Sequence, residues 1–338
     1  MQDFIASLLA QHRPFVLFRF PGQAGMHCYY QHDQAAHYTQ DYSEEGFVFA
    51  PFVAQAQQLY IPATHQKDFS LVKATPSSSI KLPLSGKAAF VEKVAAAVEA
   101  IAFTSLEKVV LSNAFSLPYN GEAIEVFTRL LTHYPNAFVS YWFHPKTGQW
   151  LGASPEQLIA LDEGQLSTVA LAGTLGRDAT ALDWTDKELH EQQLVVESIV
   201  DELRQSGAVH KLKIGERTTI KAGQLYHLQT PIRASLESKK LPTLVQALHP
   251  TPAVGGFPKT TAIRYINNKE GYDRAYYTGF LGPFSKGTTA NLFVNLRCGK
   301  ITPQQLTLFT GAGITAGSIP VNEWDEICRK ASTFLAAL

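Results

Sequence analysis

The chain has 338 residues, of which 45% are hydrophobic and 17% are charged, so it is long enough and apolar enough to bury a large core. Its 29 Lys and Arg residues balance 29 Asp and Glu residues, and charge therefore gives no reason to expect a nucleic acid or an anionic membrane surface as a partner. No apolar run reaches the roughly 18–20 residues that are needed to span a bilayer.

Helix and strand signals follow one another along the chain after a Ser- and Pro-rich stretch at 75–87. Hydrophobic spacing and residue type predict a helix at 88–101, a strand at 108–117, a helix at 123–134 and a strand at 137–143. A long helix is expected at 185–205, followed by strand-like runs at 211–220 and 225–235. The last third holds strand candidates at 274–284, 290–299 and 306–314, and a closing helix at 321–338. Because strands follow strands without regular alternation with helices, we predict an α+β fold with large antiparallel sheets.

The closing stretch 308–330, LFTGAGITAGSIPVNEWDEICRK, begins like a phosphate-binding loop. A dinucleotide-binding loop would follow the first strand of a βαβ unit and would have an acidic residue about 20 positions later. The glycines here lie near the C-terminus, and the Gly-Lys-Ser/Thr of a Walker loop is absent. The pattern therefore argues against a nucleotide site.

Glutamates recur at helical spacing on two of the predicted helices. In the closing helix, Glu323, Glu326 and Lys330 form a row beside the apolar stripe, which by itself is typical of a solvated face with one ion pair. The helix 186–203 carries Glu188 and Glu191 at the same i, i+3 spacing. If the two helices face one cleft, four carboxylates would repel one another unless a cation lay between them, and oxygen ligands favour Mg²⁺. The spacing alone leaves open whether the helices meet.

Backbone and arginine groups near this row indicate an anionic ligand. The segment Thr310–Gly313 follows a strand, and its small residues would let a carboxylate approach free backbone amides. Arg297, on a neighbouring strand candidate, could bind a second carboxylate through both arms of its guanidinium group. We therefore expect a small ligand with at least two carboxylates, one of them on Mg²⁺.

Seven ordered motifs give this chain a family resemblance: KVVLS, LGASPE, ALAGT, DKELHEQQLVVE, HPTPAVGGFPK, NLRC and GAGITAGSIPVNEWDEICRKA. In this order they resemble the chorismate-utilising enzymes, which include isochorismate, salicylate, anthranilate and aminodeoxychorismate synthases. The resemblance covers residues 88–338, the expected chorismate-binding catalytic region. It implies large antiparallel sheets packed face to face and flanked by helices, with residues 1–87 completing the same fold.

The resemblance also implies roles for particular residues. Lys108 of KVVLS matches the general base that activates water, and Glu156 of LGASPE matches the general acid. Glu191 and Glu326 match the Mg²⁺ ligands, with Glu188 and Glu323 expected to bind the ion through water. The positions that match substrate-binding or site-lining residues are Thr174, His227, Ala253, Tyr277, Arg297, Phe309, Gly311, Ala312, Gly313 and Lys330.

Several positions separate the branches of the family. Lys108 stands where the aminating enzymes have Gln, and Ala172 stands where aminodeoxychorismate synthases have a nucleophilic lysine. Ala253, followed by Val254, favours isochorismate synthase over salicylate synthase, which tends to have Thr at the first of these positions. Asn113 departs from the usual Arg of the family. Salicylate synthase and a catalytically silent chorismate-binding homologue therefore remain as alternatives.

The expected reaction is the reversible, Mg²⁺-dependent conversion of chorismate to isochorismate, in which water attacks C2 and the C4 hydroxyl leaves. The product would serve menaquinone or siderophore biosynthesis. We expect a monomer without a glutaminase subunit. The start, MQDFIASLLAQHRPF, lacks the pattern of a signal peptide, and three widely spaced cysteines (Cys28, Cys298 and Cys328) fit neither a disulfide framework nor a zinc site. Both features suit the cytoplasm.

Overall fold

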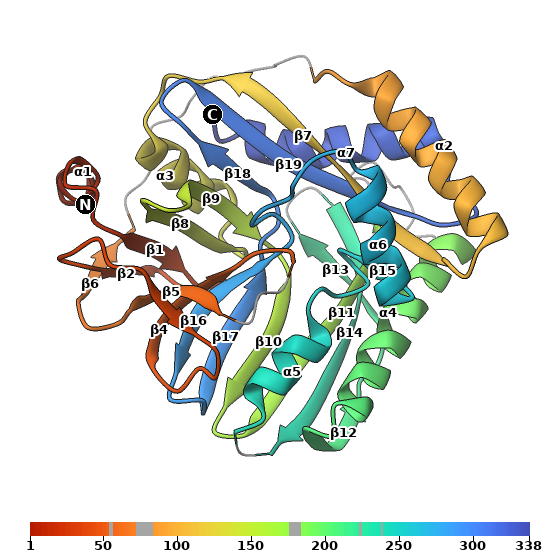
Figure 1. Cartoon of the computed structure of the whole chain (residues 1–338), viewed down its shortest axis with the longest axis horizontal. Coiled ribbons are helices and arrows are strands. Elements are labelled where there is room, and N and C mark those ends of the chain that lie inside the picture. Colours follow the sequence, from red (N-terminus) through yellow and green to blue (C-terminus); the bar gives the residue numbers. More distant parts are fainter. Residues whose placement is uncertain (54–56, 72–83, 176–183, 223–224, 238) are drawn as a thin grey trace.

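Two antiparallel sheets lie face to face in the computed structural model, which describes residues 1–53, 57–71, 84–175, 184–222, 225–237 and 239–338 (Figure 1). The first sheet has nine strands, in the order β15 (Gly256–Phe257), β7 (Lys108–Pro118), β19 (Gln305–Ile314), β18 (Cys298–Ile301), β9 (Gly148–Ser154), β8 (Phe138–His144), β1 (Phe15–Arg19), β2 (Gly25–Tyr30) and β6 (Gln66–Ser70). The second sheet has ten strands, with β13 paired only to β14, and its strands are β12 (Val209–Ile214), β13 (Thr218–Ala222), β14 (Leu225–Leu236), β11 (Gln165–Leu175), β10 (Gln157–Asp162), β17 (Thr289–Val294), β16 (Phe280–Ser285), β4 (Glu45–Ala50), β5 (Gln58–Pro62) and β3 (His37–Thr39).

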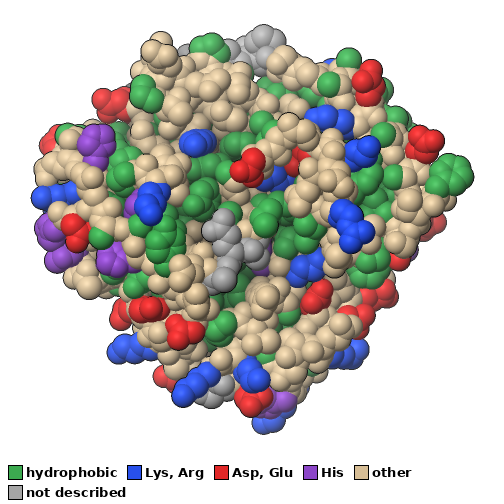
Figure 2. All heavy atoms as spheres, viewed as in Figure 1, with side chains coloured by type: hydrophobic (Ala, Val, Ile, Leu, Met, Phe, Trp, Pro, Cys, Tyr) green, Lys and Arg blue, Asp and Glu red, His purple; other side chains and the backbone are tan. Residues whose placement is uncertain are grey.

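Helices cover the outer faces of both sheets. The first sheet packs against α1 (Gln2–Ala10), α2 (Lys87–Phe103), α3 (Ala123–His133) and α7 (Pro320–Leu335), and the second packs against α4 (Asp186–Gln205) and α5 (Leu241–Leu248). Helix α6 (Lys259–Lys269) lies beside β7 and β15. Acidic and basic side chains are interspersed over the face in Figure 2, as the balanced composition leads one to expect. None of the helices in the described part of the chain combines the length and apolarity needed to cross a membrane.

The core between the sheets is aromatic because strands alternate their side chains between two faces. In β1, Val16 and Phe18 point into the space between the sheets, whereas Phe15 and Leu17 point towards the outer helices. Phe138 of the first sheet stacks on Phe293 of the second, with ring centroids 4.1 Å apart. Face-to-face packing of this kind holds the two sheets in a fixed relation, and the site depends on that relation.

Strands from the N-terminal part of the chain belong to both sheets. Strand β1 pairs with β8 in the first sheet, and β4 pairs with β16 in the second. The division of the chain at residue 87 stays a prediction. All three cysteines are free thiols, and Cys28 and Cys298 are buried.

The predicted α+β fold with large antiparallel sheets is confirmed, and the helices expected at 88–101, 123–134 and 185–205 are α2, α3 and α4. Three strand predictions were wrong in extent. The run 211–220 covers parts of two strands, β12 and β13, which are separated at 215–217. In the candidate 274–284 only residues from Phe280 onward form a strand, because Ala275 and Thr278 take left-handed backbone conformations. The candidate 290–299 is two strands, β17 and β18, in different sheets, and Arg297 lies between them with φ 48°.

Candidate active site

The chain passes from one sheet to the other at two adjacent places. Strand β9 leads into β10 through Glu156, and β17 leads into β18 through Arg297. The two crossings are hydrogen-bonded to each other: the Ser154 hydroxyl donates to the Val294 carbonyl at 2.5 Å, and the Glu156 carbonyl accepts from the Val294 amide at 3.0 Å. This arrangement brings a carboxyl and a guanidinium group, more than 140 positions apart in sequence, into one pocket.

The pocket lies between β7, β19, the crossings and helices α4 and α7. Most residues that the sequence singled out line it: Lys108, Glu156, Glu191, His227, Ala253, Tyr277, Arg297, Phe309, Gly311, Gly313, Glu326 and Lys330. The side chain of Thr174 lies outside the described part of the structure. Ala312 is fully buried in the core between the first sheet and its helices, so its side chain points away from the pocket.

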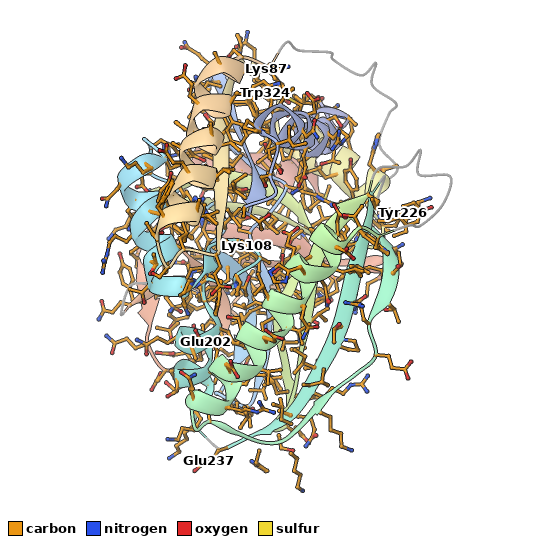
Figure 3. All side chains as sticks on the ribbon, turned by 90° about the vertical axis from the view of Figure 1, so that its right-hand side faces the viewer. Lys87, Lys108, Glu202, Tyr226, Glu237 and Trp324 are labelled. Atoms are coloured by element: carbon orange, nitrogen blue, oxygen red, sulfur yellow. The ribbon has the colours of Figure 1, made fainter. Side chains whose placement is uncertain are left out.

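Lys108 is the first residue of β7 and is fully buried. Its Nζ lies 2.9 Å from Oε1 of Glu191 on α4, and Figure 3 shows it near the centre of the molecule, beside that helix. Gly313 makes this pairing possible, because a Cβ there would lie 2.6 Å from Glu191 Oε1 and 3.1 Å from Lys108 Cε. Lys108 Nζ makes no hydrogen bond to any described residue that meets the geometric criteria. Its N–H groups are therefore available to a ligand.

Glu156 is a carboxyl group in a dry environment, with 6% of its surface exposed. Burial raises its pKa to about 7, against the opposing effects of the positive charges of Lys108 and Lys330 and of the Thr251 hydroxyl 3.5 Å away. A carboxyl group with such a pKa carries a proton in a substantial fraction of molecules near neutral pH. A protonated acid and an amine in one pocket are the components of general acid–base catalysis.

Helices α4 and α7 meet at the pocket, and each contributes one carboxylate to it. Glu191 comes from α4, and Glu326 of α7 pairs with Lys330 at 2.7 Å. Lys330 also donates to the carbonyl of Gly311 at 2.9 Å, which ties α7 to β19. The question that helical spacing left open, whether the two rows of glutamates face one cleft, is thus answered for one residue of each row.

The other two glutamates lie outside the pocket lining. Glu188 closes a capping box at the start of α4, where its carboxylate accepts hydrogen bonds from the Thr185 amide at 3.1 Å and from the Thr185 hydroxyl. Glu323, in the first turn of α7, is 2% exposed. Their binding of Mg²⁺ through water stays a prediction.

The donors that line the pocket fit Mg²⁺. Among the described residues, no group of three or more His, Cys, Asp or Glu side chains could form a protein cage for an ion. Mg²⁺ is usually held by one or two carboxylates and keeps water or substrate oxygens in its other positions. Glu191 and Glu326 match that donor set.

The guanidinium group of Arg297 lines the pocket, where it could bind an anion. Its left-handed backbone, at φ 48°, is uncommon for a residue other than glycine, and such strain persists where the surrounding structure enforces it. Burial lowers its pKa, and no carboxylate pairs with it among the described residues. The His227 Nδ1 lies 3.0 Å from the Gly173 carbonyl and must donate to it, so Nε2 accepts from the Arg297 guanidinium 3.4 Å away. Burial, reinforced by the Arg297 charge, lowers the pKa of His227 to about 4, which keeps this imidazole neutral.

Two aromatic rings of a stack, those of Tyr277 and Phe309, line the pocket. Phe309 lies between Tyr277 and Trp150, with ring centroids 5.5 and 5.4 Å away and interplanar angles of 16° in both cases. Ala253, Val254 and Leu296 continue this apolar surface. Trp150 was missed from the sequence because it does not line the pocket and supports Phe309 from behind.

A buried ion pair behind the pocket was also missed. Glu270 and Arg274, four positions apart, are 1% and 2% exposed, and the Nε–Oε2 distance is 2.6 Å. The sequence signal was an acidic and a basic residue at i, i+4 after α6, a spacing too common on protein surfaces to stand out.

Comparison with known proteins gives the family. A sequence model of the protein family described as "Chorismate binding enzyme" matches residues 36–338, so the similarity to the family begins well before the motifs at 88–338. The chain is 37% identical over 261 residues to the salicylate biosynthesis isochorismate synthase of Pseudomonas aeruginosa. The alignment covers 73% of this chain but only 54% of that protein. It is 33% identical over 308 residues to the isochorismate synthase EntC of Escherichia coli K12, covering 83% of this chain and 77% of that one.

Solved structures agree with the fold. The menaquinone-specific isochorismate synthase MenF of Escherichia coli matches with a TM-score of 0.81 at 23% identity, over 96% of this chain and 88% of that one. A putative 2,3-dihydroxybenzoate-specific isochorismate synthase, DhbC of Bacillus anthracis, matches with a TM-score of 0.83 at 24% identity, over 98% of both chains. With a family model that matches nearly the whole chain, this protein belongs to the chorismate-binding enzymes.

Proposed function

We propose that the chain is an isochorismate synthase, which converts chorismate reversibly to isochorismate. The observation that carries this proposal is the joint placement of Lys108 and Glu156 in one pocket, where burial raises the pKa of the carboxyl group to about 7. Addition of water at C2 and loss of the C4 hydroxyl need a base and an acid at once, and these two groups supply them. The isochorismate synthases among the relatives support the same reaction.

The proton inventory of the proposed reaction balances within the pocket. Lys108, in its neutral form, takes a proton from water as the oxygen bonds to C2. The ring double bonds shift, and Glu156 gives its proton to the C4 oxygen, which leaves as water. Glu191 Oε1 lies 2.9 Å from Lys108 Nζ, so the proposed base and one proposed Mg²⁺ ligand are neighbours in the pocket.

The anionic substrate is held by groups of three kinds. Arg297 offers a bidentate site for one carboxylate, and Lys330 with the backbone at Gly311 and Gly313 lies near the other. Glu191 and Glu326 would hold Mg²⁺, which supplies charge neutralisation and orientation for the ring carboxylate. The stacked Tyr277 and Phe309 rings would form the wall beside the substrate ring.

Water is the proposed nucleophile, so the reaction needs no ammonia and no glutaminase subunit. We propose that the chain acts in the cytoplasm as a monomer, and that its product serves menaquinone or siderophore biosynthesis. The aliphatic side chains of Ala253, Val254 and Leu296 in the pocket support isochorismate over salicylate as the final product.

The test is an incubation of the purified chain with chorismate and Mg²⁺, with products separated by chromatography. We expect isochorismate to accumulate until the reaction reaches equilibrium, without pyruvate, and we expect EDTA to stop it. Salicylate and pyruvate in equal amounts would show a salicylate synthase instead. Binding of chorismate without turnover would show a silent homologue.

A further inference from the structure

We propose that the buried ion pair of Glu270 and Arg274 positions the walls of the pocket for catalysis, without touching the substrate itself. This inference rests on the proposed function and names a positioning residue, Arg274, for that reaction. Neither Glu270 nor Arg274 lines the pocket, so any influence on catalysis must act through neighbouring residues.

The pair is bidentate and almost completely dry. Arg274 Nε donates to Glu270 Oε2 at 2.6 Å, and Arg274 Nη2 donates to Oε1 at 2.7 Å. The two side chains are each 1% exposed. Taking both charges out of water is costly, and an apolar pair of similar volume would often serve stability as well or better. The use of a charged pair here therefore needs a reason beyond stability.

The remaining donors of Arg274 reach three separate segments that form the pocket. Nη2 donates to the Val110 carbonyl on β7 at 2.6 Å, and Nη1 donates to the Val254 carbonyl at 2.9 Å and to the Thr278 hydroxyl at 3.2 Å. Val110, Val254 and Thr278 all line the pocket. One planar group thus fixes the spacing between a strand, a loop and a turn, which a flexible ammonium group could not do in the same way.

Glu270 attaches the pair to the strand that carries the proposed base. Its Oε1 accepts from the backbone amide and the hydroxyl of Ser112, at 2.7 and 2.6 Å. Ser112 and Val110 lie on β7, four and two residues beyond Lys108. Both members of the ion pair therefore hold the same strand close to its first residue.

The turn after Arg274 is strained and carries an aromatic wall residue. Ala275 and Thr278 have φ values of 48° and 58°, which non-glycine residues adopt only when their surroundings enforce it. Tyr277 lies between them, and its amide donates to the Arg274 carbonyl at 2.9 Å. The guanidinium carbon lies 5.8 Å from the centre of the Tyr277 ring and 4.5 Å from that of Phe52. Arg274 thus supports both the backbone and the ring of this wall.

The groups assigned to the substrate carboxylates have other supports. Arg297 bonds to His227, and Lys330 bonds to Glu326 and to the Gly311 carbonyl. Loss of the Arg274 fork should therefore misplace Lys108 and Tyr277 while it leaves the anchors of the substrate in place. We expect kcat to fall while KM changes little, whereas a purely structural pair would lower thermal stability and leave kcat per folded molecule unchanged.

The experiment compares Arg274→Lys with Arg129→Lys. Arg129 is a matched control, because it also pairs with a glutamate at i, i+4 (Glu125, 3.6 Å) and donates to a backbone carbonyl (Ala337, 2.6 Å), but it lies on α3 outside the pocket lining. We expect Arg274→Lys to lower kcat by about 10- to 100-fold with KM within about threefold. Arg129→Lys should keep kcat within about twofold, since isolated partly exposed pairs contribute little.

Two further variants keep the test decisive if Arg274→Lys fails to fold. Glu270→Gln keeps the shape of the side chain and Ser112→Ala removes one hydroxyl, so both should lower kcat, the second by only about two- to fivefold. Unchanged kcat per folded molecule in these variants, with only a lower Tm, would overturn the positioning role. If the wild-type chain converts chorismate to a different product, the proposed function fails, yet the ratio of variant to wild-type kcat still tests the positioning role.

Discussion

Charged groups on two sides of the pocket differ in whether they have an ion-pair partner. One side is formed by helices α4 and α7, and the other by the crossings between the sheets. On the helix side, Glu191 and Glu326 each pair with a lysine within 3 Å. At the crossings between the sheets, Glu156 is buried and Arg297 is half-buried, and neither has an ion-pair partner among the described residues. Paired charges are tolerable in a protein interior, whereas a single buried ionisable group costs stability and shifts its pKa. The crossings therefore hold a carboxyl group and a guanidinium group with shifted pKa values, and the helices hold carboxylates that are already paired with lysines.

The largest expected effect comes from replacement of Lys108, the proposed base, which pairs with Glu191 of the helix side. Lys108→Ala removes the proposed base and leaves the Glu191 carboxylate without its partner. We expect kcat for isochorismate formation to fall by about 10²- to 10⁴-fold, measured by a chromatographic product assay. Replacement of the surface residue Lys146 by Ala is the control and should leave the rate unchanged. A Lys108→Ala variant that retained the wild-type rate would contradict the assignment of the base.

Glu156→Gln should separate activity from stability. The amide cannot give up a proton in the same way, so we expect kcat to fall by about 10²- to 10⁴-fold. The pKa of Glu156 in the folded chain, about 7, lies above its ordinary value of 4.5, so the folded chain holds this proton more tightly than the unfolded chain. The contribution of Glu156 to stability is therefore complete below pH 4.5 and is lost as the pH rises through 7.

It follows that Glu156→Gln should be more stable than the wild type above pH 7, by roughly 1–3 kcal/mol, and should lose this advantage near pH 4.5. Urea unfolding at pH 5 and pH 8 measures the difference. An advantage that did not depend on pH would show that burial of the carboxyl group is not the cause.

Two glutamates of α4, Glu191 and Glu188, allow metal binding to be separated from helix capping. Glu191→Gln removes a pocket carboxylate, and we expect Mg²⁺ affinity to fall by about 10- to 100-fold, in calorimetry and in the Mg²⁺ dependence of the rate. Glu188→Gln removes the capping carboxylate and should cost about 0.5–1 kcal/mol of stability. Because Glu188 is expected to bind the ion only through water, this variant should lower Mg²⁺ affinity less than Glu191→Gln does. If Glu188→Gln weakened Mg²⁺ binding as much as Glu191→Gln, the division between a capping and a pocket carboxylate would be wrong.

How much of this site was predictable depended on whether a residue's position follows from local spacing. Helical periodicity indicated that α4 and α7 carry rows of carboxylates, and Glu191 and Glu326 do reach the pocket. The same periodicity did not distinguish Glu188, although Thr185 and Glu188 form the T-x-x-E signature of a capping box. The burial of Glu323 depends on how the first turn of α7 packs, which no spacing within the helix encodes.

The parts that escaped prediction depend on contacts between distant segments. Residues 290–299 alternate as one strand would, and only the relation of the two sheets reveals that the chain changes sheet at Arg297. The proposed role of the ion pair of Glu270 and Arg274 depends on hydrogen bonds from Arg274 to the carbonyl groups of Val110 and Val254, which are more than 15 positions away in sequence. Tertiary packing, which local sequence patterns do not express, determined both.

The central claim is that Lys108 and Glu156 direct a water molecule to C2 while the C4 hydroxyl leaves. The most direct measurement is to run the reaction in water enriched in ¹⁸O and to examine the isochorismate by mass spectrometry. We expect one ¹⁸O atom in the C2 hydroxyl group of each product molecule, and slower labelling of chorismate at C4 through the reverse reaction. Isochorismate without ¹⁸O would mean that the hydroxyl group migrates within the substrate, and it would contradict the roles of both residues.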